Sequence, residues 1–368
     1  MTALFSDLHP TDRSTIYLRP ICGVVAAARP AARIGGAWAG FDEVEVLVRD
    51  GKDTMTGRGG LDDLAAWANC VGRDHKGRIE CLLARLTCQR PAFAGISFDE
   101  PRIMGVLNVT PDSFSDGGDY ATPETAIARG NEHTRNGAAV LDIGGESTRP
   151  GSCLVPSVEE AKRVVPVVEA LVGTGSGAVI SIDSRKAEVM VKAVGAGASI
   201  INDISALSGD DRALAVARTL GVAVILMHCQ GEPKTMQAAP AYINPPAEIF
   251  DYLEGRIEAC LAAGISRANI AVDPGIGFGK SLEHNLAILS HLSLFQGLGC
   301  VVLIGVSRKS FIGHITGEER PKARLPGSVA ATVVGLNQGV QMVRAHDVSE
   351  TRQAVGVWWA IHGGGVEA

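Results

Sequence analysis

Short apolar segments alternate with longer amphipathic segments along most of this chain, from about residue 102 to residue 362. Each apolar segment is rich in β-branched residues and ends in polar residues or glycine, which is typical of a buried β-strand. The amphipathic segment that follows each of them has the spacing of a helix, so the pattern predicts consecutive strand–helix units. Eight strands are predicted, at residues 102–110, 139–145, 179–184, 199–205, 223–229, 270–277, 301–307 and 342–347.

Strands that are apolar along their whole length need cover on both faces, as in a parallel sheet. Alternation with helices gives βα units, and eight such units can close into a barrel. The units span 261 residues, 102–362, which is close to the roughly 250 residues of a typical barrel. We therefore predict an α/β protein with a (β/α)8 TIM barrel, and an open doubly wound sheet is the structural alternative.

The first 88 residues do not continue this repeat. They predict two strands followed by two helices, at residues 15–21, 41–51, 61–72 and 79–86. We interpret 1–88 as a small N-terminal α+β extension of unknown role and 89–368 as the catalytic barrel; a partly ordered tail is the competing interpretation of 1–88. Residues 89–101 are predicted to form a short hairpin that closes the barrel floor.

Composition narrows the possible partners. Hydrophobic residues make up 46% of the chain and charged residues 20%, and the formal net charge is -6. A soluble globular protein has this composition, and the chain has no basic field that would attract nucleic acid or an anionic membrane. Any anionic substrate must therefore be held by a local group of cations.

The cysteines and the N-terminus indicate a compartment. Eight cysteines occur singly, without a C-x-x-C pair, which favours reduced thiols over a disulfide framework. The N-terminus has no basic segment followed by an apolar one, and no apolar run approaches the roughly 20 residues of a membrane helix. We expect a cytoplasmic protein.

Polar side chains follow nearly every predicted strand. In (β/α)8 enzymes the chemistry lies at the carboxyl ends of the strands and in the loops after them. A single Asp there is more often a helix cap or turn residue, but the bias at all eight ends together predicts a pocket. The residues concerned are Asn108, Glu146, Thr148, Arg149, Asp183, Asn202, Asp203, His228, Asp273, Ser307, Arg308, Lys309, Arg344 and His346.

Arg344 and His346 are two residues apart on the last predicted strand, so their side chains are expected on the same side. A pair of cations at a barrel mouth suits an anion, and phosphate is the candidate that fits it best. The alternative is that Arg344 pairs with a buried carboxylate such as Asp273.

Four further strand-end residues, Asp183, Asn202, Asp273 and Lys309, combine carboxylates, an amide and an ammonium. This set suits a flat heterocycle with alternating hydrogen-bond donors and acceptors. A buried Asp–Lys ion pair is the structural alternative for two of the four, but it leaves the amide and the second carboxylate without a role.

Two other features resemble known motifs, a phosphate-binding loop and a metal site, but neither matches in full. Residues 273–281 end like a phosphate-binding Walker A loop, but Pro274 occupies the position of its first glycine. We interpret this glycine-rich segment as a flexible loop that passes close beneath a ligand. His228 has no partner cluster that would complete a metal site, so a packed or hydrogen-bonded histidine is favoured.

Seven segments together resemble the dihydropteroate synthase family, in the family's order. The resemblance covers about residues 90–368, and the extension before it lies outside the usual family pattern. The segments are MGVLNVTPDSFSDGG (104–118), DIGGESTRPG (142–151), INDI (201–204), LMHCQGEPKTMQ (226–237), DPGIGFGK (273–280), VSRKSFIG (306–313) and RAHDVSET (344–351).

The resemblance implies a transferase of folate biosynthesis. It would join (7,8-dihydropterin-6-yl)methyl diphosphate to 4-aminobenzoate, giving 7,8-dihydropteroate and diphosphate, as an expected homodimer with Mg²⁺ as cofactor. Loss of diphosphate leaves a cation at the pterin methylene, which the carboxylates of Asp183 and Asp273 would stabilise, so an SN1-like displacement is expected. Mobile loops after the first two strands would exclude water from the cation.

The family's residue roles carry over by motif. Asp183, Lys309, Arg344 and His346 would be catalytic, and Asn108 would bind Mg²⁺ together with the substrate diphosphate. The diphosphate would be held by Thr148, Arg344 and His346, and the pterin by Asp183, Asn202, Asp273 and Lys309. The 4-aminobenzoate pocket and its loops would comprise Phe114, Arg149, Pro150, Phe278 and Ser307.

Departures from the family pattern are small. Ser184 stands where the family usually has Thr, and it keeps the hydroxyl. The loop with Arg149 and Pro150 has no inserted residues of the kind seen in sulfonamide-insensitive relatives, so sulfonamide sensitivity is expected. Two rival functions stay open. A pterin-dependent methyltransferase domain would not need the Arg344 and His346 pair, and a non-catalytic paralogue would be expected to have lost pocket residues.

Overall fold

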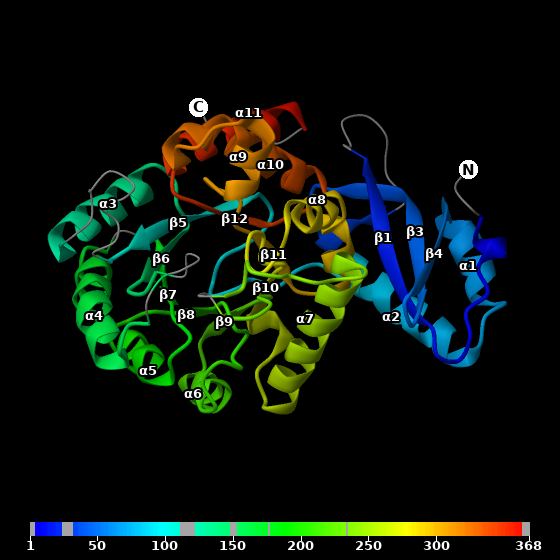
Figure 1. Cartoon of the computed structure of the whole chain (residues 1–368), viewed down its shortest axis with the longest axis horizontal. Coiled ribbons are helices and arrows are strands. Elements are labelled where there is room, and N and C mark those ends of the chain that lie inside the picture. The colour runs from blue at the N-terminus through cyan, green and yellow to red at the C-terminus, as the bar shows by residue number, and fades with distance from the viewer. Residues whose placement is uncertain are drawn as a thin grey trace.

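The computed structural model describes residues 4–23, 32–110, 122–147, 152, 154–175, 177–232 and 235–362. Figure 1 shows two parts within them. A barrel with helices around it occupies the left of the view, and a smaller unit with the first strands and helices packs against its right side. The barrel positions the site, and the smaller unit is the predicted extension.

The predicted barrel is confirmed. Among the described residues, eight parallel strands close in the order β10-β11-β12-β5-β6-β7-β8-β9, so the open-sheet alternative is wrong. The strands are β5 (Arg102–Asn108), β6 (Val140–Gly144), β7 (Val179–Asp183), β8 (Ile200–Asp203), β9 (Ala223–Met227), β10 (Ile270–Asp273), β11 (Val301–Ile304) and β12 (Met342–Ala345). Each strand is shorter than its predicted segment because the last residues of every segment already belong to the loop that follows.

Helices follow the strands around the outside of the barrel (Figure 1). They are α3 (Pro123–Arg135), α4 (Ser157–Gly173), α5 (Ala187–Gly195), α6 (Ala213–Leu220), α7 (Pro245–Ala262), α8 (Leu282–Ser290), α9 (Ser310–Thr316), α10 (Leu325–Asn337) and α11 (Val348–Ile361). The helix α8 ends at Ser290, and a 3-10 segment, η5 (Leu292–Leu298), follows it. The short helix α9 was not predicted, because it lies within the polar loop after the seventh strand.

A short hairpin closes the barrel floor, as predicted. Phe93 and Ile96 form an antiparallel bridge, and both are buried together with Phe98. Their side chains share one apolar cluster with residues at the amino ends of the strands, such as Val140 and Val301. With this end filled by side chains, the opposite end is left for ligands.

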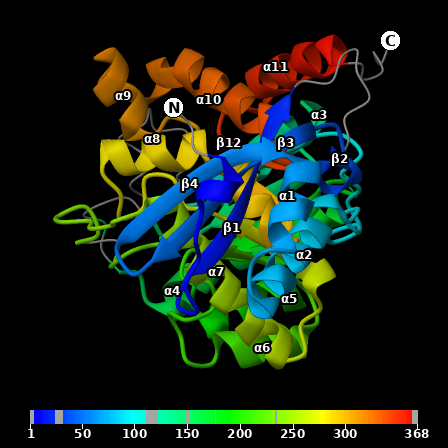
Figure 2. The ribbon, with the colours of Figure 1, turned by 90° about the vertical axis from the view of Figure 1, so that its right-hand side faces the viewer.

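The extension folds as an α+β unit. The strand β3 (Gly40–Asp50) pairs antiparallel with β1 (Thr15–Gly23) along one edge and with β2 (Ala32–Arg33) and β4 (Asp53–Gly60) along the other. The helices α1 (Leu61–Ala68) and α2 (Arg73–Thr87) follow. In Figure 2 this sheet faces the viewer in front of the barrel. The strand β4 was not predicted, because its sequence DTMTGRGG has few apolar residues.

The extension packs on the barrel at α7 and η5. Its buried side chains belong to the same apolar core as those of the barrel helices. Tyr17 packs edge-on against Phe250 of α7, with ring centroids 5.6 Å apart, and its hydroxyl donates to Asp251 at 2.8 Å. Arg78 and Arg85 of α2 both pair with Glu254 of α7 at 2.7 Å. These contacts do not fit a partly ordered tail for the described residues of this segment.

No helix in the described part of the chain is both long enough and apolar enough to span a membrane.

Candidate active site

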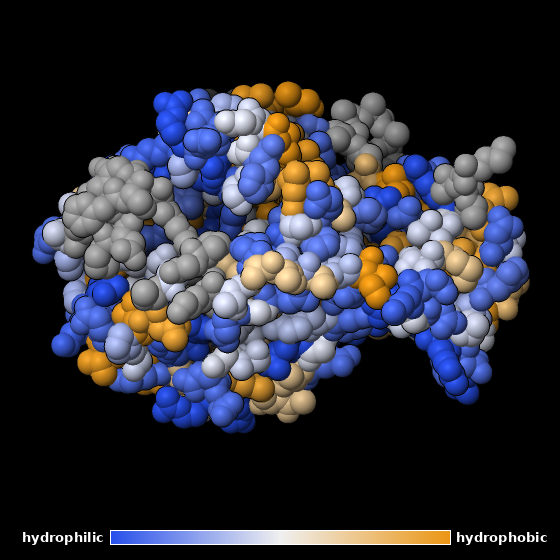
Figure 3. All heavy atoms as spheres, viewed as in Figure 1, coloured by the Kyte–Doolittle hydropathy of each residue, from blue (hydrophilic) through white to orange (hydrophobic). Residues whose placement is uncertain are grey.

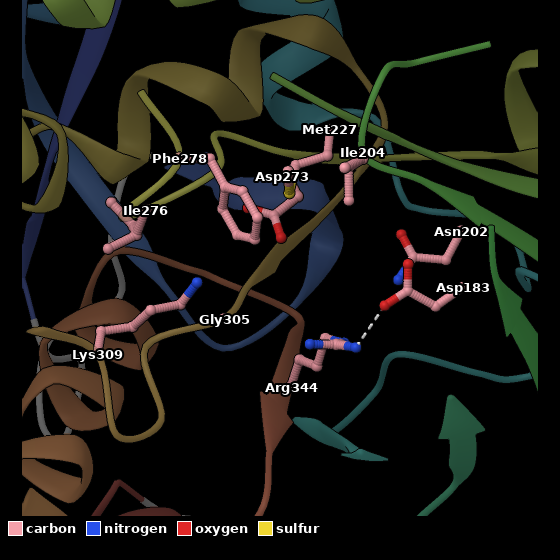
Figure 4. A pocket seen from close by; sticks show the side chains of 10 residues that line it. All are labelled: Asp183, Asn202, Ile204, Met227, Asp273, Ile276, Phe278, Gly305, Lys309 and Arg344. Atoms are coloured by element: carbon pink, nitrogen blue, oxygen red, sulfur yellow. Dashed lines mark hydrogen bonds and ion pairs between the residues drawn. The ribbon is translucent and has the colours of Figure 1, made fainter. Parts of the chain in front are cut away.

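A pocket opens among the carboxyl ends of the barrel strands (Figure 4). Six of the residues that the sequence nominated line it together, although they come from four strands, β7, β8, β10 and β12, and from the loops after β10 and β11. The lining consists of Asp183, Asn202, Ile204, Met227, Asp273, Ile276, Phe278, Gly305, Lys309 and Arg344. The expected convergence of polar groups from separate strands is therefore present.

Asp142 of β6 is the centre of a buried hydrogen-bond network beside this pocket. It is fully buried and accepts hydrogen bonds from Ser181 Oγ at 2.6 Å and Asn202 Nδ2 at 3.0 Å. Arg344 Nε donates to the same carboxylate at 2.6 Å. Sequence reasoning missed this residue, although a lone Asp within the apolar segment 139–145 was a usable signal.

Arg344 bridges two carboxylates. Besides Asp142, its guanidinium contacts Asp183 through Nη2 at 2.8 Å, the dashed line in Figure 4. The alternative in which Arg344 pairs with a buried carboxylate is therefore confirmed. The partners are Asp142 and Asp183, however, and not Asp273, the example named from the sequence. The register of the barrel decides the partners, because β12, β6 and β7 point these side chains into one interior.

The two pocket carboxylates are both held in surroundings that oppose ionisation. Burial raises the pKa of Asp183 to about 7, and the neighbouring charge of Asp142 adds to the rise while Arg344 opposes it. Burial also raises the pKa of Asp273, against a hydrogen bond of 2.7 Å from the Gly275 amide and the charge of Lys309. Desolvated groups of this kind are typical of functional sites.

Lys309 lies at the amino end of α9 and reaches the pocket from the opposite side to Asp183 (Figure 4). Its ammonium lies over the ring of Phe278, 4.0 Å from the centroid. Burial lowers the pKa of Lys309 to about 8, opposed by the charge of Asp273. Among the described residues no carboxylate forms an ion pair with Lys309, so the buried Asp–Lys pair is not observed.

Three other nominated residues lie beside the pocket rather than in its lining. The amide of His346 donates to Ser307 Oγ at 3.2 Å, and His346 Nδ1 is 3.2 Å from the same atom. β12 ends at Ala345, so His346 follows the strand and does not line the pocket with Arg344. Asn108 ends β5, and its Oδ1 and the Asp183 carboxylate flank Gly144.

The glycine-rich loop after β10 lies close to the backbone of the loop after β9. A Cβ on Gly275 would lie 1.9 Å from the carbonyl oxygen of His228, and one on Gly279 would lie 2.2 Å from that of Gln230. Both glycines also have positive φ, +70° and +61°, a conformation that favours glycine. The loop after β10 thus makes a close approach to the loop after β9, and its passage beneath a ligand stays a prediction.

His228 is buried and hydrogen-bonded, as favoured from the sequence. Its Nδ1 lies 3.0 Å from Nζ of Lys280, a second lysine that sequence reasoning passed over. Burial, assisted by the charge of Lys280, lowers the pKa of His228 to about 3. The imidazole is therefore neutral and accepts the hydrogen bond.

Four nominated residues lie outside the described residues. They are Phe114 in the loop after β5 and Thr148, Arg149 and Pro150 in the loop after β6. Their roles stay predictions that come from the family resemblance.

Comparison with known proteins assigns the family. The family described as pterin binding enzyme matches residues 104–346. Dihydropteroate synthases from Neisseria meningitidis serogroup B and Escherichia coli K12 are 46% and 45% identical, over 72% of this chain and 94% and 93% of theirs.

Solved structures agree with the sequence relatives. A Xanthomonas albilineans dihydropteroate synthase with 4-aminobenzoic acid superposes with a TM-score of 0.69 at 46% identity, covering 74% of this chain and 97% of its own. A Yersinia pestis dihydropteroate synthase in complex with a sulfonamide drug has the same TM-score at 44% identity, covering 72% and 95%. The chain therefore belongs to the dihydropteroate synthase family, whose members are transferases built on a (β/α)8 barrel.

Proposed function

We propose that the pocket at the barrel mouth displaces diphosphate from (7,8-dihydropterin-6-yl)methyl diphosphate with the amine of 4-aminobenzoate. One observation carries the assignment of this reaction to the pocket: Asp183, Asn202, Asp273, Lys309 and Arg344 reach it from separate strands and loops. Family membership supplies the substrates, and the pocket supplies the polar groups that they need.

The pterin is assigned to Asp183, Asn202, Asp273 and Lys309. These groups offer acceptors for the amino edge of a flat heterocycle and donors for its carbonyl. Departure of diphosphate leaves a cation at the pterin methylene. The negative charges of the two carboxylates would stabilise this cation. A carboxylate fixed in place, as Asp183 is by Arg344, stabilises such a cation without reorganising. The displacement is accordingly SN1-like.

The diphosphate is assigned to Arg344, His346 and Thr148. Arg344 binds the two carboxylates through Nε and Nη2, and its guanidinium has further N–H donors that can bind the diphosphate. The Asp183 carboxylate can therefore stay in place beside the pterin cation as the leaving group becomes charged. Asp183, Lys309, Arg344 and His346 together form the catalytic set.

The 4-aminobenzoate site is assigned to Phe278 and Ser307 with the loop residues Phe114, Arg149 and Pro150. The ring of Phe278 lines the pocket beneath the ammonium of Lys309, so an aromatic substrate next to the pterin would contact it. The Xanthomonas albilineans relative solved with 4-aminobenzoic acid supports this substrate class.

The donor set fits a Mg²⁺ ion that is shared with the substrate. No group of three or more His, Cys, Asp or Glu in the described residues could hold a metal ion. Mg²⁺ usually keeps several waters and binds substrate phosphates with few protein ligands, and Asn108 at the end of β5 offers one amide oxygen. When bound, Mg²⁺ would neutralise charge on the leaving diphosphate.

A homodimer is proposed through the outer faces of α10 and α11. Val334, Val357 and Ile361 are 45%, 63% and 67% exposed there, and Figure 3 shows apolar atoms gathered at the top of the molecule above these helices. Adjacent exposed apolar side chains are typical of interfaces. Val357→Glu should convert a dimer to a monomer in light scattering.

Two broader assignments also stay proposals. The cytoplasmic location rests on the cysteines, seven of which are described and free, and cell fractionation checks it. The second assignment divides the chain into an extension, 1–88, and a barrel, 89–368. We propose that the reaction takes place wholly in the barrel. The matched relatives cover 72% of this chain, in agreement with a barrel that carries the family's activity.

The deciding experiment is release of diphosphate and formation of dihydropteroate from the two substrates with Mg²⁺. Methyltetrahydrofolate turnover is the control for the methyltransferase alternative. Lys309→Ala should lose most of the activity. A wild-type protein that forms no dihydropteroate would favour the non-catalytic paralogue and contradict the proposal.

A further inference from the structure

Lys280 is a buried lysine that the reaction described above does not use, and burial lowers its pKa to about 7. It is only 3% exposed, and its Nζ donates to His228 Nδ1 at 3.0 Å, to Phe278 O at 2.9 Å and to His228 O at 3.3 Å. These three acceptors are neutral and match the three donors of an ammonium. No carboxylate within the described ranges forms an ion pair with it, so Lys280 is held by hydrogen bonds alone.

These hydrogen bonds join the loops after β9 and β10. His228 belongs to the first loop, and Phe278 to the second. The two backbones touch where Gly275 and Gly279 leave no room for a side chain. Tyr242 OH donates to the Gly279 carbonyl at 2.9 Å and adds a further tie. Lys280 thus lies at the seam between the two loops, behind the residues that face the pocket.

Phe278 connects this seam to the pocket. Its carbonyl is bound by Lys280, and its ring lines the pocket and supports the Lys309 ammonium at 4.0 Å. A buried acceptor that loses its donor is costly, so the loop would have to move if the Lys280 ammonium were removed. Any such movement displaces the Phe278 ring and the surface on which Lys309 rests.

We propose that Lys280 is a positioning residue, which sets the place of the Phe278 ring, and through it that of Lys309, by binding the Phe278 carbonyl and His228. It touches neither substrate. The inference deepens the proposed function and rests on it, because its effect is measured on the 4-aminobenzoate site assigned to Phe278. Lys280 lies in the segment 273–280, whose glycines make the close approach of its ammonium to His228 possible.

The test is a comparison of KM and kcat in the full-length protein. Lys280→Met keeps the length of the side chain but removes its donors. The KM for 4-aminobenzoate should rise about tenfold or more, with a smaller change in kcat per folded molecule. Lys192→Met on α5 is the control, because Lys192 is an exposed lysine with an i,i+4 partner. It should leave both constants unchanged.

A double-mutant cycle separates positioning from a general structural role. If Lys280 acts through Phe278, Lys280→Met should add little to the KM of a Phe278→Ala variant. Additive effects would overturn the inference. His228→Phe keeps an aromatic ring but removes one acceptor, so it should raise the same KM by a smaller factor and serves if Lys280→Met does not fold.

The wild type is assayed first under the same conditions. No dihydropteroate from the wild type would contradict the proposed function itself. An active wild type together with a Lys280→Met variant whose KM for 4-aminobenzoate stays within about twofold would overturn only the role of Lys280.

Discussion

Arg344 ties Asp183 to Asp142 across the barrel interior, with Nη2 2.8 Å from Asp183 Oδ2 and Nε 2.6 Å from Asp142 Oδ2. One guanidinium therefore orients a carboxylate that faces the pocket and a carboxylate that does not. Asp183, the carboxylate in the pocket, is held in place by Arg344, and Arg344 is itself held by its ion pair with Asp142. Such preorganisation is what a developing cation requires.

Replacing the pocket carboxylate should separate chemistry from folding. We expect Asp183→Asn to lower kcat by about 100-fold or more, because the amide keeps the shape but cannot offset the pterin cation. The midpoint of denaturant unfolding should change little, because Arg344 keeps its ion pair with Asp142. Asp62→Asn, in an exposed position of α1, is the control for the loss of one negative charge. Wild-type kcat in Asp183→Asn would contradict the assigned role.

The anchoring carboxylate should matter for stability instead. Asp142→Asn leaves Arg344 and Asn202 facing an amide that can accept through one oxygen only. We expect a loss of about 3 kcal/mol in the free energy of unfolding, measured by urea denaturation. Ser181→Ala removes only the hydrogen bond to Asp142 and should cost about 1 kcal/mol. Equal stability of Asp142→Asn and the wild type would show that the network is dispensable.

The pH dependence of kcat/KM should follow two pocket groups. The pKa of Asp183 is raised to about 7 and that of Lys309 is lowered to about 8. Below the first value the carboxyl is neutral and cannot stabilise a cation, and above the second the ammonium is lost. Activity should thus fall on both sides of an optimum between them. The basic limb should be absent in Lys309→Met, whereas a limb due to substrate ionisation would persist.

The ion pairs between the extension and α7 should stabilise the whole chain. Glu254 accepts from both Arg78 and Arg85. Burial raises the pKa of Glu254, but these two arginines outweigh it and lower that pKa overall. The contribution is therefore present above the ordinary pKa and lost as pH falls through the lowered one. Glu254→Gln should cost about 2 to 3 kcal/mol at neutral pH.

Glu80→Gln on the same helix as Arg78 is the matched control. Glu80 has a side chain that is 64% exposed and lies 3.9 Å from Lys76, so its loss should change the free energy of unfolding by less than about 0.5 kcal/mol. Equal effects of the two substitutions would mean that the extension is not held by these pairs.

Sulfonamide sensitivity is expected from the loop that contains Arg149 and Pro150, which has no inserted residues. The Yersinia pestis relative was solved with a sulfonamide drug. Competition against 4-aminobenzoate in the dihydropteroate assay measures this directly. Resistant growth of cells in which this chain replaces the host enzyme would contradict the expectation.

The barrel was predictable because its signal is local. Apolar segments such as 223–229 and 301–307 carry the periodicity of buried parallel strands, and eight of them with intervening helices suit one closed arrangement. The rule that barrel chemistry lies at the carboxyl ends of the strands then nominates Asp183, Asn202 and Lys309 from the sequence alone. Local pattern also found the strand β1 and the helix α2 of the extension.

The partners of those residues were decided only by the tertiary structure. Asp142 and Arg344 are 202 residues apart, and Lys280 and His228 are 52 apart; no periodicity links either pair. Tyr17 likewise meets Asp251 only because the extension docks on α7. Periodicity reports which face of an element is buried, whereas the register and closure of the barrel decide which buried polar groups meet and which charges are shared.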